Sequence, residues 1–286
     1  MMRRELSRPT SSGTRVAMYL WLAPFYRSTI ALLDGRFDES ERLARQALAI
    51  GERAQDQNAM VFFNVQIVTL RGLQGRSAEV EANVKGMVEK SPAGAKGWQA
   101  TMAKLYYDMD QRAEAEAEFE RLASNNFADL AIDGAYVTAL ALLGQVAWYI
   151  GDKRRAARLY ELLKPFAGQN IAIGSAAVFY GPVSRYLGLM ATTMCRWEAA
   201  AQHFDEALEM TAEMGARPFE ALVQVEYGSM LLARRSQGDH EEATRLLNQG
   251  LATAKDLGMA KLIRDARSTA ASSQPRVELA GETAGD

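Results

Sequence analysis

The feature that most constrains this chain is a short pattern that recurs six times. Each copy begins at a turn residue, continues through polar or acidic residues, and then places a small residue four positions before another apolar one. The copies are Gly35–Leu48, Gly75–Val88, Asp110–Ala123, Gly151–Lys164, Cys195–Leu208 and Gly238–Leu251. Neighbouring copies lie 35 to 44 residues apart. Such a period is typical of stacked helix pairs, in which each unit buries its apolar face against the next.

The pattern predicts two helices per copy, joined at the turn. A glycine such as Gly35 can adopt the positive φ that ends a helix at its C′ position. Acidic residues such as Asp38 and Glu39 then favour the N-terminus of the next helix, where the helix dipole attracts negative charge. The four-residue spacing places the small residue and its apolar partner on one helix face. The small residues are Ser40, Val80, Ala115, Ala156, Ala200 and Ala243.

Composition supports an all-α fold and argues against several functions. The chain has 286 residues, is rich in Ala and Leu, and contains only 7 Pro, a balance that favours helix. Lys and Arg number 33 against 35 Asp and Glu, for a formal charge of −2. This balance gives no overall attraction to nucleic acid or to anionic lipid. We therefore expect no direct nucleic-acid partner and no membrane.

Few residues could support chemistry. One Cys excludes an internal disulfide, and two His do not form the cluster that an ordinary zinc site needs. No Gly-rich phosphate loop with the GxxxxGK[ST] spacing occurs. We therefore expect no cofactor, no metal and no enzymatic activity.

The two ends of the chain are predicted to be disordered. Residues 1–14 and 268–286 are polar and lack a periodic apolar face, which leaves a repeat domain over residues 15–267. Basic residues precede the apolar stretch Val16–Ala23, but Pro24 follows and no A-x-A cleavage site appears, so a cytoplasmic location is expected. Between Pro165 and Pro182 we predict an irregular connection with a short helix and no sheet.

The fifth copy resembles the tetratricopeptide-repeat (TPR) family most completely. Leu187–Gly188 match the Leu-Gly pair of helix A, Trp197 takes the aromatic position of the turn, and Ala200 with Phe204 match helix B. The resemblance implies an α-solenoid of about six helix pairs that form a right-handed superhelix. The stretch from Leu159 to Gly174 is similar to the superhelical region of large bacterial regulators. These include relatives of the maltotriose-dependent transcriptional activator and class III nucleotide cyclases linked to AAA-type ATPases.

The same resemblance implies a binding surface on the concave wall, which helix A lines. Carried onto this chain, the wall positions include Lys104, Tyr107, Gln145, Trp148 and Arg185. Tyr, Trp and Arg dominate binding hot spots because they bury a large area at small entropic cost. The alternative is that the aromatic residues are ordinary core.

Other polar residues are predicted to be structural. His203 should lie on a partly solvated flank of its helix, and His240 in a solvent-facing turn. Cys195 takes the turn position that other copies give to Gly, and a buried or half-buried inert thiol is expected. Lys153–Arg155 could meet phosphate or an acidic partner, or form a solvated helix face.

These observations favour recognition over catalysis. The expected function is a non-enzymatic interaction module that binds a protein, a peptide or a small effector in a bacterial signalling or transcription-control system. One alternative is an all-α enzyme or accessory protein of a biosynthetic pathway that uses the groove as its active site. Another is a remnant or fragment of a larger regulator. The sequence leaves the partner and the oligomeric state open.

Overall fold

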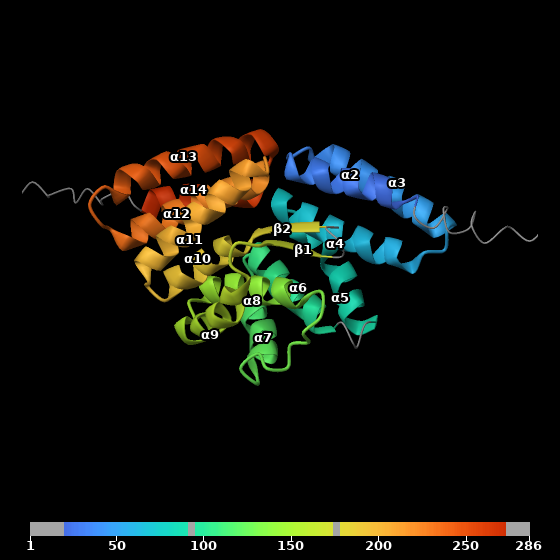
Figure 1. The fold of residues 1–286 in the computed structure, drawn as a ribbon, viewed down its shortest axis with the longest axis horizontal. Coiled ribbons are helices and arrows are strands. Elements are labelled where there is room, and N and C mark those ends of the chain that lie inside the picture. The colour runs from blue at the N-terminus through green and yellow to red at the C-terminus, as the bar shows by residue number, and fades with distance from the viewer. Residues whose placement is uncertain (1–19, 91–94, 174–177, 273–286) are drawn as a thin grey trace, which may run out of the picture.

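The computed structural model describes residues 20–90, 95–173 and 178–272, and these residues are mainly helical (Figure 1). The prediction of an all-α fold is confirmed, with one small β-hairpin added. The elements before the hairpin are α2 (Leu22–Leu33), α3 (Phe37–Arg53), α4 (Gln57–Gln74), η1 (Ser77–Val80), α5 (Glu81–Lys90), α6 (Ala95–Asp108), α7 (Arg112–Ala123), α8 (Tyr136–Ile150), α9 (Lys153–Leu163) and η2 (Lys164–Phe166). The remaining elements are β1 (Asn170–Ile173), β2 (Val178–Pro182), α10 (Val183–Thr193), α11 (Trp197–Glu213), α12 (Arg217–Arg234), α13 (Asp239–Leu257) and α14 (Ala260–Ser272).

The predicted boundaries of the repeat domain are only partly covered. Residues 1–14 and 273–286 lie outside the described residues. At the other end of the predicted domain, α14 continues to Ser272, so the expected boundary at residue 267 falls inside a helix. Among the described residues no helix is both long and apolar enough to cross a membrane.

The recurring pattern organises the helix packing. The six small residues and their apolar partners are all buried, with exposed fractions of 7% or less. Consecutive helices pack together in each copy, as α2 does on α3, α6 on α7, and α12 on α13. In the middle of the chain α6, α8 and α10 also pack side by side. Small residues thus lie where two helices approach closely, as the four-residue spacing predicts.

The turns follow the prediction with one exception. Gly35, Gly75 and Gly151 have positive φ angles of 80°, 72° and 77°. Gly238 also has a positive φ, but it lies at the N-cap of α13, and Arg235 provides the left-handed residue that ends α12. Its predicted role as the end of the preceding helix is therefore wrong, because α12 already ends at Arg234, with Arg235 as its C-cap.

The segment predicted to lack a sheet contains an antiparallel hairpin, so that prediction is wrong. β1 pairs with β2 from Asn170 opposite Pro182 to Ile173 opposite Val178, with an irregularity after Ile171. Every residue of β2 is buried, and α4, α10 and α11 contact this strand. Two short strands persist here because neighbouring helices cover them, whereas an isolated hairpin is marginal in water.

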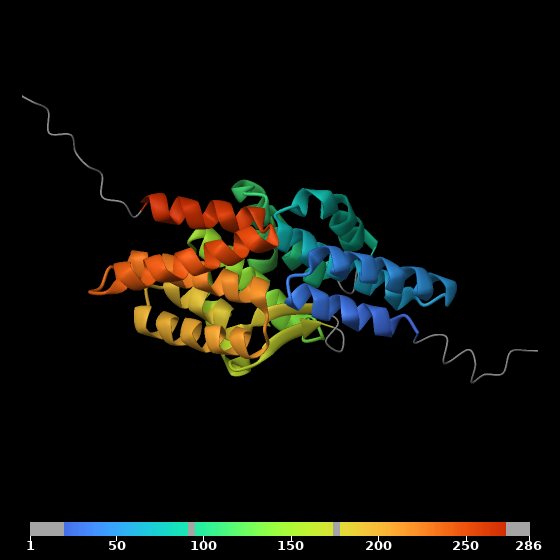
Figure 2. The ribbon, with the colours of Figure 1, turned by 90° about the horizontal axis from the view of Figure 1, so that it is seen from above.

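The two ends of the helical array meet (Figures 1 and 2). α2 contacts α12, and α4 contacts α14. A Cβ added to Gly35 would lie 2.6 Å from Leu257 Cδ2, and one added to Gly75 would lie 2.7 Å from the Lys261 backbone nitrogen. Gly75 is therefore required for close approach to the backbone as well as for its positive φ, whereas at Gly35 the neighbour is the end of a flexible side chain. These contacts join the first described helices to the last ones.

Candidate functional site

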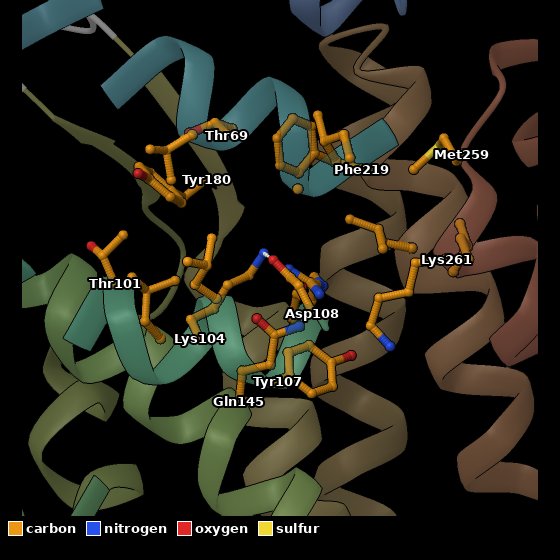
Figure 3. Close-up of a pocket in the computed structure, with 18 of the residues that line it drawn as sticks. Thr69, Thr101, Lys104, Tyr107, Asp108, Gln145, Tyr180, Phe219, Met259 and Lys261 are labelled. Atoms are coloured by element: carbon orange, nitrogen blue, oxygen red, sulfur yellow. Dashed lines mark hydrogen bonds and ion pairs between the residues drawn. The ribbon is translucent and has the colours of Figure 1, made fainter. Parts of the chain in front are cut away.

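A cavity of about 70 Å³ lies where α4, α6, α8, α10, α12, α14 and β2 converge (Figure 3). We call it the central cavity. Four of the five predicted wall residues line it, namely Lys104, Tyr107, Gln145 and Arg185. Trp148 does not line it, although its half-buried ring lies 6.4 Å from that of Tyr107. The structure thus brings together four residues that the TPR resemblance placed on one wall.

Lys104 is paired within its own helix. Its Nζ donates to Asp108 Oδ2 at 2.5 Å, and Ser77 Oγ donates to the same oxygen at 3.2 Å. Asp108 is 7% exposed, so this ion pair places its carboxylate almost out of contact with solvent. The i, i+4 spacing of Lys104 and Asp108 was visible in the sequence and could have predicted this pair.

Arg185 forms a buried bidentate ion pair with Glu226 of α12. Its Nε and Nη2 donate to the two carboxylate oxygens at 2.7 and 2.6 Å, and the two side chains are 3% and 6% exposed. Burial alone would lower the pKa of Arg185, but the Glu226 carboxylate raises it above its ordinary value. The guanidinium also lies 4.8 Å from the centre of the Tyr186 ring. Glu226 had no signal in the sequence, because it comes from another repeat.

The ring of Tyr107 contacts the ammonium group of a lysine on α14, the last described helix. Lys261 Nζ of α14 lies 4.5 Å from the centre of the Tyr107 ring, a cation–π contact. Lys261 also contacts Asp265 at 3.0 Å and Asp110 at 3.4 Å. Burial is the main cause that raises the pKa of the Tyr107 hydroxyl well above its usual range. The cation that completes this part of the cavity thus comes from a helix far along the chain.

Gln145 is the one predicted wall residue that is left with an unsatisfied atom. It is 3% exposed, and its Oε1 has no hydrogen-bond partner among the described residues. Figure 3 shows Gln145 beside Lys104 and Asp108, with Lys261 on the opposite side. Each charged side chain that lines the cavity is in an ion pair: Lys104 with Asp108, Arg185 with Glu226, and Lys261 with Asp265. At about 70 Å³ the space is well below the 300 to 1,000 Å³ of ordinary ligand pockets.

The remaining candidate residues lie away from this cavity. His203 is half-buried, with a side chain 13% exposed, and its Nε2 lies 2.9 Å from the Tyr160 hydroxyl. Burial lowers the pKa of His203 below its ordinary value. His240 is exposed, as predicted, but it lies in the first turn of helix α13 and not in the connecting turn.

Cys195 is exposed, so the prediction of a buried or half-buried thiol is wrong. Its φ of 57° confirms that it takes the turn position of a glycine, and this turn projects the side chain into solvent. Lys153 Nζ lies 3.4 Å from its Sγ. In the basic run, Lys153 and Arg154 are exposed, whereas Arg155 pairs with Glu120 and Asp152.

Among the residues that the structure describes, no three His, Cys, Asp or Glu side chains form a group that could hold a metal ion. Comparison with models of known protein families finds no match, and comparison with curated proteins finds none either. The TPR resemblance therefore stays a prediction from the residues quoted above.

Proposed function

We propose that the chain is a non-enzymatic, TPR-like interaction module. Its helices would form about six pairs in a right-handed solenoid, with α14 as an additional helix that closes the inner face. Support comes from the buried small residues of all six copies and from the side-by-side packing of α6, α8 and α10. Four wall residues predicted from the resemblance also converge on one cavity.

The observation that carries this proposal is the position of α14. The Lys261 ammonium lies over the ring of the wall residue Tyr107, and the Arg264 guanidinium lies 3.6 Å from the Asp110 carboxylate in the turn after α6. A helix of the chain itself therefore occupies the surface that a partner would use. Recognition then works by exchange, in which a protein or peptide segment with a cation in the place of Lys261 displaces α14.

The setting is proposed from the resemblance and the charge balance. We place the module in a bacterial signalling or transcription-control system of the cytoplasm. Its partner is a protein or peptide, or a small effector, and it contacts neither nucleic acid nor membrane directly. The net charge of −2 supports the last point, because it provides no general attraction to polyanions.

A labelled peptide with the sequence Ala260–Ser272 tests the exchange. In the Lys261→Glu variant of the full chain, the new carboxylate faces Asp110 and Asp265, so like charges should release the native α14. Fluorescence anisotropy should then show the peptide binding about tenfold tighter than to the wild type, which corresponds to about 1.4 kcal/mol.

Lys255→Glu is the matched control, because Lys255 is exposed on α13 and takes part in no ion pair among the described residues. Its affinity for the peptide should equal that of the wild type. If Lys261→Glu and Lys255→Glu bind the peptide equally, α14 does not cover a recognition surface and the proposal fails.

A further inference from the structure

A second cavity lies between α4, α6, α8 and the hairpin, and its volume is about 330 Å³. We call it the apolar pocket. Its walls are mainly apolar, and they include Val65 of α4, Trp98 of α6, Ala139 of α8 and Ile173 of β1. Thr101 and Tyr180 line both this pocket and the central cavity. Val61, at its edge, is 42% exposed, so the pocket opens to solvent beside an exposed apolar side chain.

The volume distinguishes this pocket from packing defects. A cavity of about 150 Å³ already admits benzene, and ordinary ligand pockets begin near 300 Å³. The apolar pocket is therefore large enough for a molecule of two fused or linked rings.

Two threonine hydroxyls are among the polar groups that line the pocket. Thr138 is 5% exposed and makes no hydrogen bond to any described residue, so its hydroxyl is available to a ligand. The Thr101 hydroxyl donates to the Gly97 carbonyl and keeps its lone pairs free to accept. One or two hydrogen bonds from an otherwise apolar wall are typical of small-molecule sites.

Charges of both signs lie at the pocket mouth and already have local partners. Lys96 Nζ donates to the Asp129 carbonyl at 2.6 Å, and Asp129 Oδ1 accepts from Asn125. Asp133 Oδ1 accepts from the Ala135 backbone nitrogen at 2.9 Å. These partners are backbone and amide groups, and they hold the three charged side chains at the exposed rim of the pocket. Placing a charge deeper, among apolar walls, costs several kcal/mol without a partner.

We propose that the apolar pocket binds a small, uncharged and predominantly apolar molecule that bears one hydrogen-bonding group for Thr138. This site lies beside the wall that α14 covers and does not depend on exchange of that helix. A ligand in it contacts Tyr180, whose backbone carbonyl accepts a 2.7 Å hydrogen bond from Tyr186, the neighbour of Arg185.

Two probes with the same ring skeleton test the site. N-phenyl-1-naphthylamine is neutral and fluoresces in apolar surroundings, whereas 8-anilinonaphthalene-1-sulfonate adds a negative charge. The wild type should bind the neutral probe saturably with one-to-one stoichiometry, and at least about tenfold more tightly than the sulfonate. Equal or tighter binding of the sulfonate would overturn the uncharged class, and absence of saturable binding of the neutral probe would overturn the site.

Two glycines provide a matched pair of variants. A Cβ at Gly97, which lines the pocket, meets only the Ala135 Cβ, at the ordinary contact distance of 3.5 Å. A Cβ at Gly86 of α5 meets nothing within 4 Å. Leu is a much better helix former than Gly, so both Gly97→Leu and Gly86→Leu should fold. Circular dichroism and a thermal melt check this.

Gly97→Leu should fill the pocket and weaken binding of the neutral probe at least about tenfold, while Gly86→Leu should bind as the wild type does. Unchanged affinity in a folded Gly97→Leu protein would show that the probe binds elsewhere and would overturn the assignment. Ala139→Phe fills the pocket from α8 and, in protein that a thermal melt shows to be folded, should give the same loss. The matched Ala117→Phe, at an exposed position of α7, should give none.

Discussion

The central cavity and the apolar pocket share two wall residues but differ in what fills them. The central cavity is about 70 Å³ and is lined by charged groups that pair with one another, such as Lys104 with Asp108. The apolar pocket is about 330 Å³, and its Thr138 hydroxyl has no partner among the described residues. Paired charges at a convergence of helices fix how the helices meet. An apolar space with an available hydroxyl instead indicates a place for another molecule.

The two cavities also draw on different parts of the chain. The central cavity needs α12 and α14, because Phe219, Lys261 and Asp265 line it. The apolar pocket is built entirely from residues that precede α10. Substitutions in the central cavity should therefore lower the free energy of unfolding and leave probe binding intact. Substitutions in the apolar pocket should weaken probe binding and leave the free energy of unfolding nearly unchanged.

The largest effect should come from breaking the buried ion pair. Arg185→Met leaves the Glu226 carboxylate buried and unpaired, and loss of one partner of such a pair typically costs about 3–5 kcal/mol. Urea denaturation should show this loss in the free energy of unfolding. The affinity of the folded variant for the neutral probe should stay within about twofold of the wild type, because Arg185 does not line the apolar pocket.

The double variant Arg185→Met/Glu226→Leu supplies the control. Replacing both charges by apolar groups removes the uncompensated carboxylate, so most of the lost stability should return. If Arg185→Met is as stable as the wild type, the pair does not hold α10 against α12. If Arg185→Met loses the probe while it remains folded, the two cavities are not separate.

Much of the fold could be predicted because its signals are local. The turn glycines, the small residues and their four-residue spacing lie within one copy of the pattern, and the structure buries both partners in all six copies. Four of the five wall residues converge on the central cavity for the same reason, since each was placed by its position in a helix. Trp148, in the last turn of α8, does not line it.

The parts that could not be predicted depend on contacts between distant segments. Nothing near Gly35 or Gly75 in the sequence indicates that Leu257 and Lys261 pack against them. The pairing of Arg185 with Glu226 and the cover over the hairpin likewise depend on residues that are distant in the sequence. The apolar pocket is a space rather than a residue pattern, so periodicity carries no signal for it.

A smaller effect should distinguish the contribution of the Thr138 hydroxyl to ligand binding from that of the pocket volume. Thr138→Val keeps the shape of the side chain and removes the hydroxyl, so 2-naphthol should bind more weakly by about 1 kcal/mol, the usual net value of one hydrogen bond. Naphthalene lacks a polar group and should bind the variant at least as tightly as it binds the wild type. Isothermal titration of both compounds measures the difference, and equal losses for the two would show that Thr138 contributes only shape.

The smallest effect should come from a titratable group that lines neither cavity. His203 is partly buried, and burial, with a smaller contribution from Lys164, lowers the pKa of its imidazole below the ordinary 6.5. The Glu206 carboxylate lies 3.9 Å from Nδ1, and at 36% exposure solvent screens much of its attraction. Folding thus favours the neutral ring. Its stabilising contribution is present above pH 6.5 and is lost as the pH falls through the lowered pKa.

We therefore expect the free energy of unfolding, measured by urea denaturation, to fall between pH 7.5 and pH 5.5 by up to about 1 kcal/mol more in the wild type than in His203→Gln. The Gln side chain keeps a polar partner for Tyr160 but does not titrate. Binding of the neutral probe should not change over the same interval, because the Thr hydroxyls of the pocket do not titrate and burial raises the pKa of Tyr180. A wild type that loses no more than His203→Gln would show that the imidazole is as solvated in the folded chain as in the unfolded one. If the affinity for the neutral probe falls together with stability in both proteins, the apolar pocket opens when the helices around His203 loosen. The walls of the pocket would then depend on the C-terminal half of the chain, although none of its lining residues comes from α10 or beyond.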